Sequence, residues 1–129
     1  VHESTFAGAS FKKATLAKAN MRATNLAGAD FSLASMPQAD FSESNLEGAK
    51  FYRADGPAAM MMKSNLKGAD LTSVNLLDGV LQKATIEGAD FKGANLFRAD
   101  FAKIKGDRRT SFDDANMKFI RFVKRPEEA

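Results

Sequence analysis

The chain repeats every five residues, and this period limits the folds that it can adopt. From about residue 4 to residue 105, a large apolar residue recurs at this interval, as at Phe31, Met36 and Phe41. A small residue, most often alanine, stands two positions before each of them. A period of five fits neither the stripe of an α-helix, which repeats about every 3.6 residues, nor the two-residue alternation of a strand. The pattern indicates a repeat protein that turns a corner every five residues and points one large and one small side chain inward on each side.

A longer period of twenty residues tells how many corners make one coil. Glycine followed by alanine recurs at this interval, at Gly8, Gly28, Gly48, Gly68 and Gly88. Four sides of five residues make twenty, so residues twenty apart should stack in successive coils through strand-like hydrogen bonds. The glycines fall at the third position of a β-turn, where positive φ is required, and Pro37 and Pro57 fall at the second position of other turns.

The repeats resemble those of the pentapeptide-repeat family. The shared pattern of a small residue, Asp or Asn, and Leu or Phe occurs at Ala29-Asp30-Phe31, Ala69-Asp70-Leu71, Ala89-Asp90-Phe91, Ala94-Asn95-Leu96 and Ala99-Asp100-Phe101. The resemblance covers about residues 4 to 105 and implies an all-β fold, a right-handed four-sided parallel β-helix or solenoid. Handedness comes from the resemblance and not from the spacing. The chain is long enough for roughly five to six coils of twenty residues.

The repeat slips near residue 106, so we divide the chain into a β-helix at 1–105 and a segment at 106–129. The next apolar centre after Phe101 that fits the pattern is Phe112, eleven residues on instead of ten. We interpret the segment as an irregular last coil that caps the solenoid. A capping helix from Asp113 to Lys124 is the alternative. Either structure is expected to close the core with Phe112, Phe119, Ile120 and Val123.

Gly56 interrupts the repeat, because it stands where every other centre has a bulky residue. Phe51 and Met61 on either side of it keep the phase of the pattern. We therefore expect one side of this coil to bulge, as chains often do near functional surfaces. The alternative is a regular coil in which Met61 or Met62 fills the gap.

The composition excludes several classes of protein. The chain has 129 residues, no cysteine and a single histidine, His2, so a disulfide framework, a cysteine metal site or a nucleophile–base pair is not expected. It has no apolar run long enough to span a membrane and no recognisable signal peptide. We predict a non-enzymatic, cytoplasmic protein without a cofactor or metal. Because Val1 already lies inside the repeat, we expect a fragment of a larger protein or a mature domain.

The outward charges bear on a function that the family resemblance implies. The best-known members imitate the width and negative charge of duplex DNA and bind DNA gyrase or topoisomerase IV. Two outward columns here carry aspartates, but Lys50 interrupts the first, and Met60 and Val80 interrupt the second. The net charge of +3 arises in residues 101–129, which have eight basic and five acidic residues. A DNA mimic is therefore the alternative function and not the main one.

Apolar residues at outward positions form a strip over the middle and C-terminal coils. The members are Pro37, Pro57, Met60, Met62, Leu77, Val80 and Phe97. Contiguous exposed apolar area usually marks a partner site, so our main hypothesis is a protein–protein interaction module. The alternatives are a loop at Gly56-Pro57 that covers the strip, and a self-association face that forms a homodimer.

A secondary basic surface accompanies the strip. It consists of Lys63, Lys83, Lys103, Lys118 and Arg121. This surface could meet an acidic partner, although a column of solvated lysines is the simpler interpretation. Nucleic acid is not an expected partner, because stacking on bases needs outward aromatics and only Tyr52 and Phe97 qualify.

The C-terminal residues carry a second resemblance. Residues 94–129 join two repeats to a Gly-Asp-Arg-Arg-Thr-Ser-Phe-Asp-Asp-Ala turn and a basic, proline-containing ending. This arrangement resembles the C-terminal part of pentapeptide-repeat accessory proteins of bacterial type VI secretion. The resemblance implies a bacterial adaptor whose partner is a secretion effector or a spike component. A structural unit that stacks through its coil ends is the third function that stays open.

Overall fold

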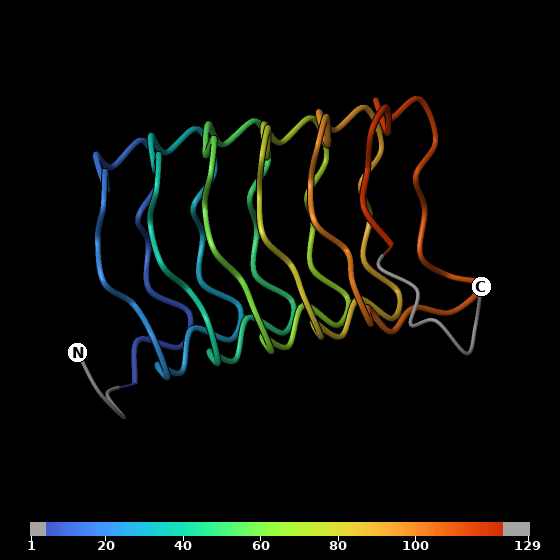
Figure 1. Ribbon diagram of the computed structural model, residues 1–129. Helices are drawn as coiled ribbons and strands as arrows, with labels where there is room; N and C mark the ends of the chain where they lie inside the picture. Colours follow the sequence, from blue (N-terminus) through green and yellow to red (C-terminus); the bar gives the residue numbers. More distant parts are fainter. Residues whose placement is uncertain (1–4, 123–129) are drawn as a thin grey trace.

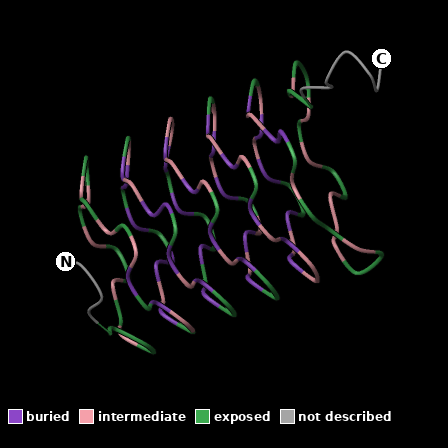
Figure 2. Ribbon diagram, turned by 60° about the horizontal axis from the view of Figure 1, so that its bottom comes forward, coloured by how far each residue is buried: buried purple, intermediate pink, exposed green. Residues whose placement is uncertain are grey.

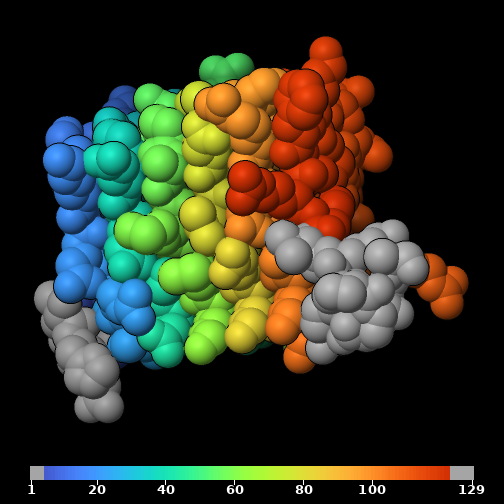
Figure 3. Space-filling model, viewed as in Figure 1, coloured from blue at the N-terminus to red at the C-terminus, as the bar shows by residue number. Residues whose placement is uncertain are grey.

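The structure, a computed structural model, describes residues 5–122, and this part of the chain winds as one solenoid (Figure 1). Successive coils advance along a single axis from Thr5 to Phe122, and each coil forms one layer of the rod (Figure 3). Between these residues the backbone forms no helix and no continuous strand. Single-residue parallel β-bridges join the coils instead. Over the same range, no helix has the length and apolar character that a membrane crossing needs.

The bridges confirm the predicted interval of twenty residues. Thr5 bridges to Asn25 and Ser10 to Asp30, and the columns that start at Thr15 and Asn20 follow the same rule. Each column lies on one side of the coil, so four sides of five residues complete a revolution. The backbone hydrogen bonds between coils are short; the Phe31 N–H, for example, donates to the Lys50 carbonyl at 2.6 Å.

Each corner of the regular coils, up to residue 105, is a β-turn whose third residue has positive φ. At the first corner, the Ala9 N–H donates to the Phe6 carbonyl at 2.9 Å, and Gly8 has a φ of 72°. Other corners reach the same conformation without glycine, as at Lys63, where φ is 57°. A Cβ built on Gly28 would have no neighbour within 4 Å. Glycine is therefore favoured at these corners because it adopts positive φ without strain, and not because space is lacking.

Asp and Asn occur often at the bridge positions because their side chains stabilise the turn that follows. The Asp30 carboxylate accepts a hydrogen bond from the Ser32 N–H at 2.8 Å. Hydrogen bonds from the side chain and backbone of Ser32 lower the pKa of Asp30. Asn75 and Asn95 accept from the backbone two residues on in the same way. These local hydrogen bonds explain the preference for short polar side chains at this position of the repeat.

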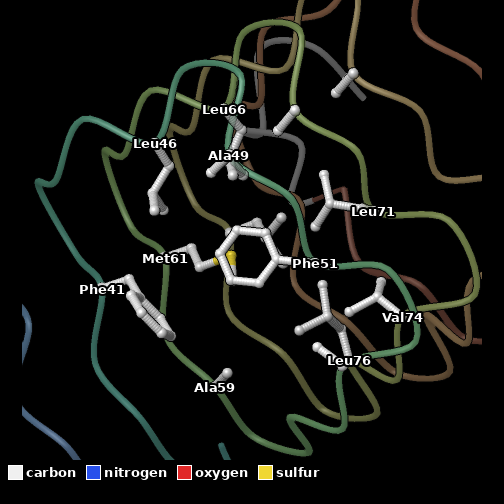
Figure 4. Close-up of a cluster of buried hydrophobic side chains, with 14 of the residues drawn as sticks. Phe41, Leu46, Ala49, Phe51, Ala59, Met61, Leu66, Leu71, Val74 and Leu76 are labelled. Carbon is white, nitrogen blue, oxygen red and sulfur yellow. The ribbon is translucent and has the colours of Figure 1, made fainter. Parts of the chain in front are cut away.

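The inward residues of all four sides fill the interior of the rod (Figure 2). The rings of Phe11, Phe31 and Phe51 stack face to face, with 4.9 Å between successive centroids. Phe51 also points into the same core as Met61, which comes from the opposite side of the coil (Figure 4). Burial is complete over the middle coils, whereas Phe11 near one end is only partly buried. The prediction that the large apolar residue of each repeat points inward is thus confirmed.

The expected bulge at Gly56 is wrong. The Gly56 N–H donates to the Asn75 carbonyl at 2.8 Å, and the Ala59 N–H closes the turn onto the Gly56 carbonyl at 3.1 Å. The coil is regular because Met36, in the preceding coil of the same column, fills the missing volume. A Cβ built on Gly56 would lie 2.9 Å from Met36 Cε. Met36 does the packing that the sequence analysis assigned to Met61 or Met62.

The predicted one-residue slip near residue 106 is confirmed. Thr85 bridges to Lys105 at the usual interval, but Asp90 bridges to Ser111, one residue further on. Two further bridges, Asn95 to Asn116 and Asp100 to Arg121, keep this new interval. The extra residue lies in the turn between Lys105 and Ser111.

Asp107 holds this irregular turn against the preceding coil. The Asp107 carboxylate accepts a hydrogen bond from the Gly88 N–H at 3.1 Å. At the equivalent position of the preceding coil, the Gly68 N–H donates to a backbone carbonyl, that of Glu87, at 2.9 Å. The Arg109 guanidinium donates to the same carboxylate at 2.8 Å and holds the pKa of Asp107 below its ordinary value. A side chain thus replaces the backbone acceptor that the slip removes.

The described part of the capping segment forms turns and bridges, with no helix from residue 113 to residue 122. Phe112 and Ile120 pack against the end of the core, as expected. Phe119, in contrast, is 74% exposed, so the expectation that it closes the core is wrong. It occupies the third position of a turn, with a φ of 58°, and that position points outward. Val123 and Lys124, which belong to the same expectation, lie outside the described residues.

Candidate functional site

The residues of the apolar strip all lie on one side of the solenoid. In the coil at the centre of the strip, this side extends from the corner at Pro57 to the corner at Lys63. Every member is half-buried, so part of each side chain faces solvent. The members are Pro37, Pro57, Met60, Met62, Leu77, Val80 and Phe97.

Backbone hydrogen bonds fix the spacing of the strip residues from coil to coil. The Pro57 carbonyl accepts from the Gln38 N–H at 2.9 Å, and the Leu77 carbonyl accepts from the Ala58 N–H at 2.7 Å. Met60 and Val80 form a direct parallel bridge. Strip residues of adjacent coils are therefore held about 4.8 Å apart. The backbone beneath the strip is therefore fixed before a partner binds, which lowers the ordering cost of binding.

Met60 and Val80 give up a stabilising contact that their column otherwise makes. In the same column, Asp40 and Asp100 each accept a hydrogen bond from the backbone N–H two residues on, at 2.9 and 3.0 Å. A methionine or valine side chain offers no such acceptor. Ser42 from the neighbouring coil serves Met62 instead, accepting from its N–H at 3.2 Å. The two apolar residues thus depart from the turn chemistry of the repeat at the centre of the strip.

Phe119 extends the strip beyond the residues that the sequence analysis selected. Its ring meets the ring of Phe97 edge to face, with 5.4 Å between centroids. The Arg98 guanidinium lies 5.2 Å from the Phe97 centroid and forms a bidentate pair with Asp78, at 2.9 Å for each hydrogen bond. Carrying the one-residue slip through the outward columns would have placed Phe119 beside Arg98. The sequence analysis missed it because it assigned this residue to the core.

Two hollows border the strip. The first, about 200 Å³, lies beside Met62 and is lined by Arg22, Ser42, Glu43, Met62, Lys63, Gln82 and Lys83. The second, about 440 Å³, lies beside Val80 and is lined by Asp78, Gly79, Val80, Arg98, Asp100, Phe119 and Arg121. The surface along the strip is therefore not flat, and the two hollows can accept side chains of a partner.

The predicted basic surface is split in two by the structure. Lys63, Lys83 and Lys103 form one column at the corner that follows the strip, one lysine in each coil. We call these three residues the basic column. Lys118 and Arg121 lie apart from it, exposed on the last described coil.

No segment covers the strip within residues 5–122. The Gly56-Pro57 corner is a regular turn, so the loop that the sequence analysis considered as a cover does not form. Over the same residues, no group of three His, Cys, Asp or Glu side chains is placed to hold a metal ion. The chemistry available on this side of the rod is apolar contact, with charge at its edges.

The sequence matches the model of the pentapeptide repeats in eight copies, over residues 4–42, 39–78 and 80–104. No curated protein sequence matches the chain. The chain resembles alr5209, a pentapeptide repeat protein from Nostoc PCC 7120, at 24% identity and a TM-score of 0.56, covering 94% of this chain and 99% of that one. It also resembles trypsin-treated QnrB1, a plasmid-mediated fluoroquinolone resistance protein, at 13% identity and a TM-score of 0.53, covering 92% and 72% of the two chains.

HetL, a pentapeptide repeat protein involved in heterocyst differentiation regulation in the cyanobacterium Nostoc, is 25% identical with a TM-score of 0.44. The match covers 100% of this chain, which spans 65% of the length of HetL. The family match, together with the four-sided coil, implies a right-handed quadrilateral β-helix. Since the matched segments extend over most of the sequence, the chain belongs to the pentapeptide-repeat family.

Proposed function

We propose that the chain is a non-enzymatic protein–protein interaction module that binds its partner through the apolar strip. Pentapeptide-repeat proteins are generally structural or interaction modules, which agrees with this class of function. The observation that carries the proposal is the run of half-exposed apolar side chains from Pro37 to Phe97 on one side of a rigid rod. Exposed apolar area of this kind is costly in water and usually marks a contact surface.

The departure from the repeat at the centre of the strip supports the proposal. Met60 and Val80 stand where Asp or Asn would stabilise the following turn. Residues that break a local rule without a structural gain are expected at functional sites. Their half-exposed side chains give the core little, because the inward neighbours Ala59 and Met61 already fill it.

The test is a pull-down from bacterial lysate with the chain and a Leu77→Asp, Phe97→Asp double variant, followed by identification of captured proteins by mass spectrometry. A matched control is the Tyr52→Asp, Thr72→Asp double variant. These residues occupy the same position of the turn in adjacent coils but at another corner, and Tyr52 is an aromatic residue at the surface, as Phe97 is. Circular dichroism and thermal melting establish that all three proteins are folded.

We expect a partner that the unmodified chain and the control capture and that the strip variant loses. Equal capture by all three folded proteins would contradict the strip as the binding surface. It would point instead to the C-terminal basic residues Lys118 and Arg121 or to the coil ends. The molecular mass in solution is measured at several concentrations as well. If the mass of the unmodified chain rises with concentration and that of the strip variant does not, the strip is a homodimer face.

The alternative function is a DNA mimic that binds DNA gyrase or a topoisomerase. The chain shares its fold with QnrB1, but at 13% identity that likeness concerns the fold alone. The charge pattern favours the interaction module, because Lys50 stands between Asp30 and Asp70 in one outward column. A supercoiling assay with purified gyrase separates the two functions. We expect no effect of the chain, and inhibition of supercoiling would favour the mimic.

At a finer level, we propose a bacterial adaptor of type VI secretion that acts in the cytoplasm. This assignment rests on the resemblance of residues 94–129 alone. The identity of the captured partner tests it, because a secretion effector or a spike component is expected. We keep the division into a β-helix at 1–105 and a capping segment at 106–129 as part of the same proposal. Stacking of whole molecules through their coil ends is the remaining alternative, and sedimentation at several concentrations would detect it.

A further inference from the structure

We propose that the segment of the partner that contacts the strip is acidic as well as apolar, with Asp or Glu side chains along the edge that meets the basic column. This inference rests on the proposed function, because it specifies the chemistry of the partner that the strip binds. It comes from the charges on this side of the rod that have no ion-pair partner among residues 5–122.

The acidic side chains at the N-terminal end of this side are already paired. Arg22 donates to the Glu43 carboxylate at 2.5 Å and to the Asp40 carboxylate at 3.4 Å. One guanidinium thus bridges two carboxylates of the following coil, one on its side and one at its corner. Both acids therefore already have a cationic partner within the chain.

The acidic side chains at the C-terminal end are paired as well. Asp78 forms the bidentate pair with Arg98, and Asp100 accepts from the Gln82 side-chain amide at 2.6 Å. A partner that brought Lys or Arg to this side would have to break these contacts. The internal pairs therefore disfavour a basic partner.

Within the described part of the chain, the lysines of the basic column have no such partner. Among residues 5–122, no carboxylate pairs with Lys63, Lys83 or Lys103. Their backbones are fixed, since the Lys63 N–H donates to the Gln82 carbonyl at 2.8 Å and the Lys83 N–H to the Ala102 carbonyl at 2.9 Å. The excess charge beside the strip is thus positive and regularly spaced.

The basic column and the strip lie close enough to serve one ligand. Lys63 directly follows Met62 of the strip, and Met62, Lys63 and Lys83 line the same hollow of about 200 Å³. A segment whose apolar side chains rest on the strip would bring its edge over these ammonium groups. Complementary charges at the rim of an interface mainly raise the association rate and select the partner.

Nucleic acid is the other polyanion that lysines can bind, and the rest of the surface disfavours it. The centre of this side is apolar, at Met60 and Val80, where a phosphate backbone finds no donor. An acidic, apolar protein segment satisfies both the strip and the basic column.

The experiment selects binders from a displayed library of random peptides on the full chain and on a Lys63→Glu, Lys83→Glu, Lys103→Glu variant. The control is a Lys12→Glu, Lys67→Glu, Lys92→Glu variant, which makes the same change in net charge at exposed positions of other corners. Thermal melts establish that each protein is folded. Selected peptides are then titrated against all three proteins and against the Leu77→Asp, Phe97→Asp variant.

We expect peptides that combine large apolar residues with Asp or Glu, and that bind about tenfold or more weakly to the reversed basic column but not to the control. Peptides that need Leu77 and Phe97 but show no acidic preference would overturn this inference and leave the proposed function standing. Peptides indifferent to both sets of substitutions, or no enrichment, would count against both. Retention of a DNA duplex by the chain, lost in the reversed column, would identify a nucleic-acid surface instead.

Discussion

At the scale of single residues, the packing of Gly56 against Met36 shows how the column tolerates a missing side chain. The two residues occupy equivalent positions in adjacent coils, and Met36 Cγ would lie 3.1 Å from a Cβ on Gly56. Met36 is fully buried, and its flexible side chain fills the space that a large residue at position 56 would occupy. The next residue of the same column, Leu76, fills this space in its own coil. Methionine suits irregular gaps of this kind.

This packing predicts that restoring the repeat at Gly56 destabilises the protein. Gly56→Leu should lower the free energy of unfolding by about 1–3 kcal/mol, because the new side chain overlaps Met36. Combining it with Met36→Ala should cost less than the two single changes together, since each variant relieves the defect of the other. Denaturant unfolding of the four proteins measures this coupling. Additivity within about 0.5 kcal/mol would contradict the account of the gap.

The lowered pKa of Asp107 predicts that the stability of the fold depends on pH. The Arg109 side chain lowers the pKa of Asp107 in the folded protein, so this carboxylate stabilises the fold at pH values above the unfolded pKa of about 3.9. The contribution should shrink as the pH falls below that value and vanish as the pH passes through the lower, folded pKa. The stability gap between the unmodified chain and Asp107→Asn should therefore narrow in acid.

Melting temperatures from neutral pH down to acid measure this gap. Asp113→Asn is the matched control, because its side chain accepts no hydrogen bond within the described residues. If the difference in melting temperature between the unmodified chain and Asp107→Asn stays constant with pH, the charge of the carboxylate contributes nothing, and the side chain acts only as an acceptor for the Gly88 N–H.

At the scale of the coil, buried hydroxyl groups link successive turns. At most corners an N–H closes the turn directly, as where the Ala29 N–H donates to the Leu26 carbonyl at 3.0 Å. The hydroxyl of Ser44, from the following coil, enters one such turn, accepting from the Thr24 N–H at 3.1 Å and donating to the Met21 carbonyl at 2.5 Å. Through these two hydrogen bonds, Ser44 links the first described coil to the second.

Ser44→Ala should cost about 1–3 kcal/mol, because both hydrogen bonds are lost in a buried place. Ser64→Ala in the same column is the control, since the Ser64 hydroxyl donates only within its own turn, to Met61 at 2.7 Å. We expect Ser64→Ala to be nearly neutral, as alanine is the usual residue of the repeat there. Equal losses in the two variants, measured by denaturant unfolding, would show that the contact between coils contributes nothing of its own.

The elements of the coil were largely predictable, because each follows from local chemistry. The period of five gave the corners, the interval of twenty gave the stack, and the jump from Phe101 to Phe112 gave the slip. What the sequence could not give depends on contacts between coils. The aligned columns make Met36 a neighbour of Gly56 and Phe119 a neighbour of Arg98, but how the Met36 side chain fills the gap and how the Phe119 ring meets Phe97 depend on side-chain conformations.

At the scale of the whole molecule, the rod presents different chemistry on different sides. The predicted strip residues fall on one side, but the pairing of acids there with Arg22 and Arg98 was not foreseen, since it depends on side-chain conformations. Handedness came from the family and not from the spacing. The count of five to six coils stays a prediction.

The most direct test is a methyl NMR titration of the labelled chain with the partner that the pull-down captures. The strip carries methyl probes at Met60, Met62, Leu77 and Val80, and Met21 and Met117 near the two ends of the described chain are internal controls. We predict that signals of the strip shift or broaden on binding while those of Met21 and Met117 stay in place. Changes confined to Met21 or Met117, with the strip signals unmoved, would show that the partner binds at a coil end and would contradict the account.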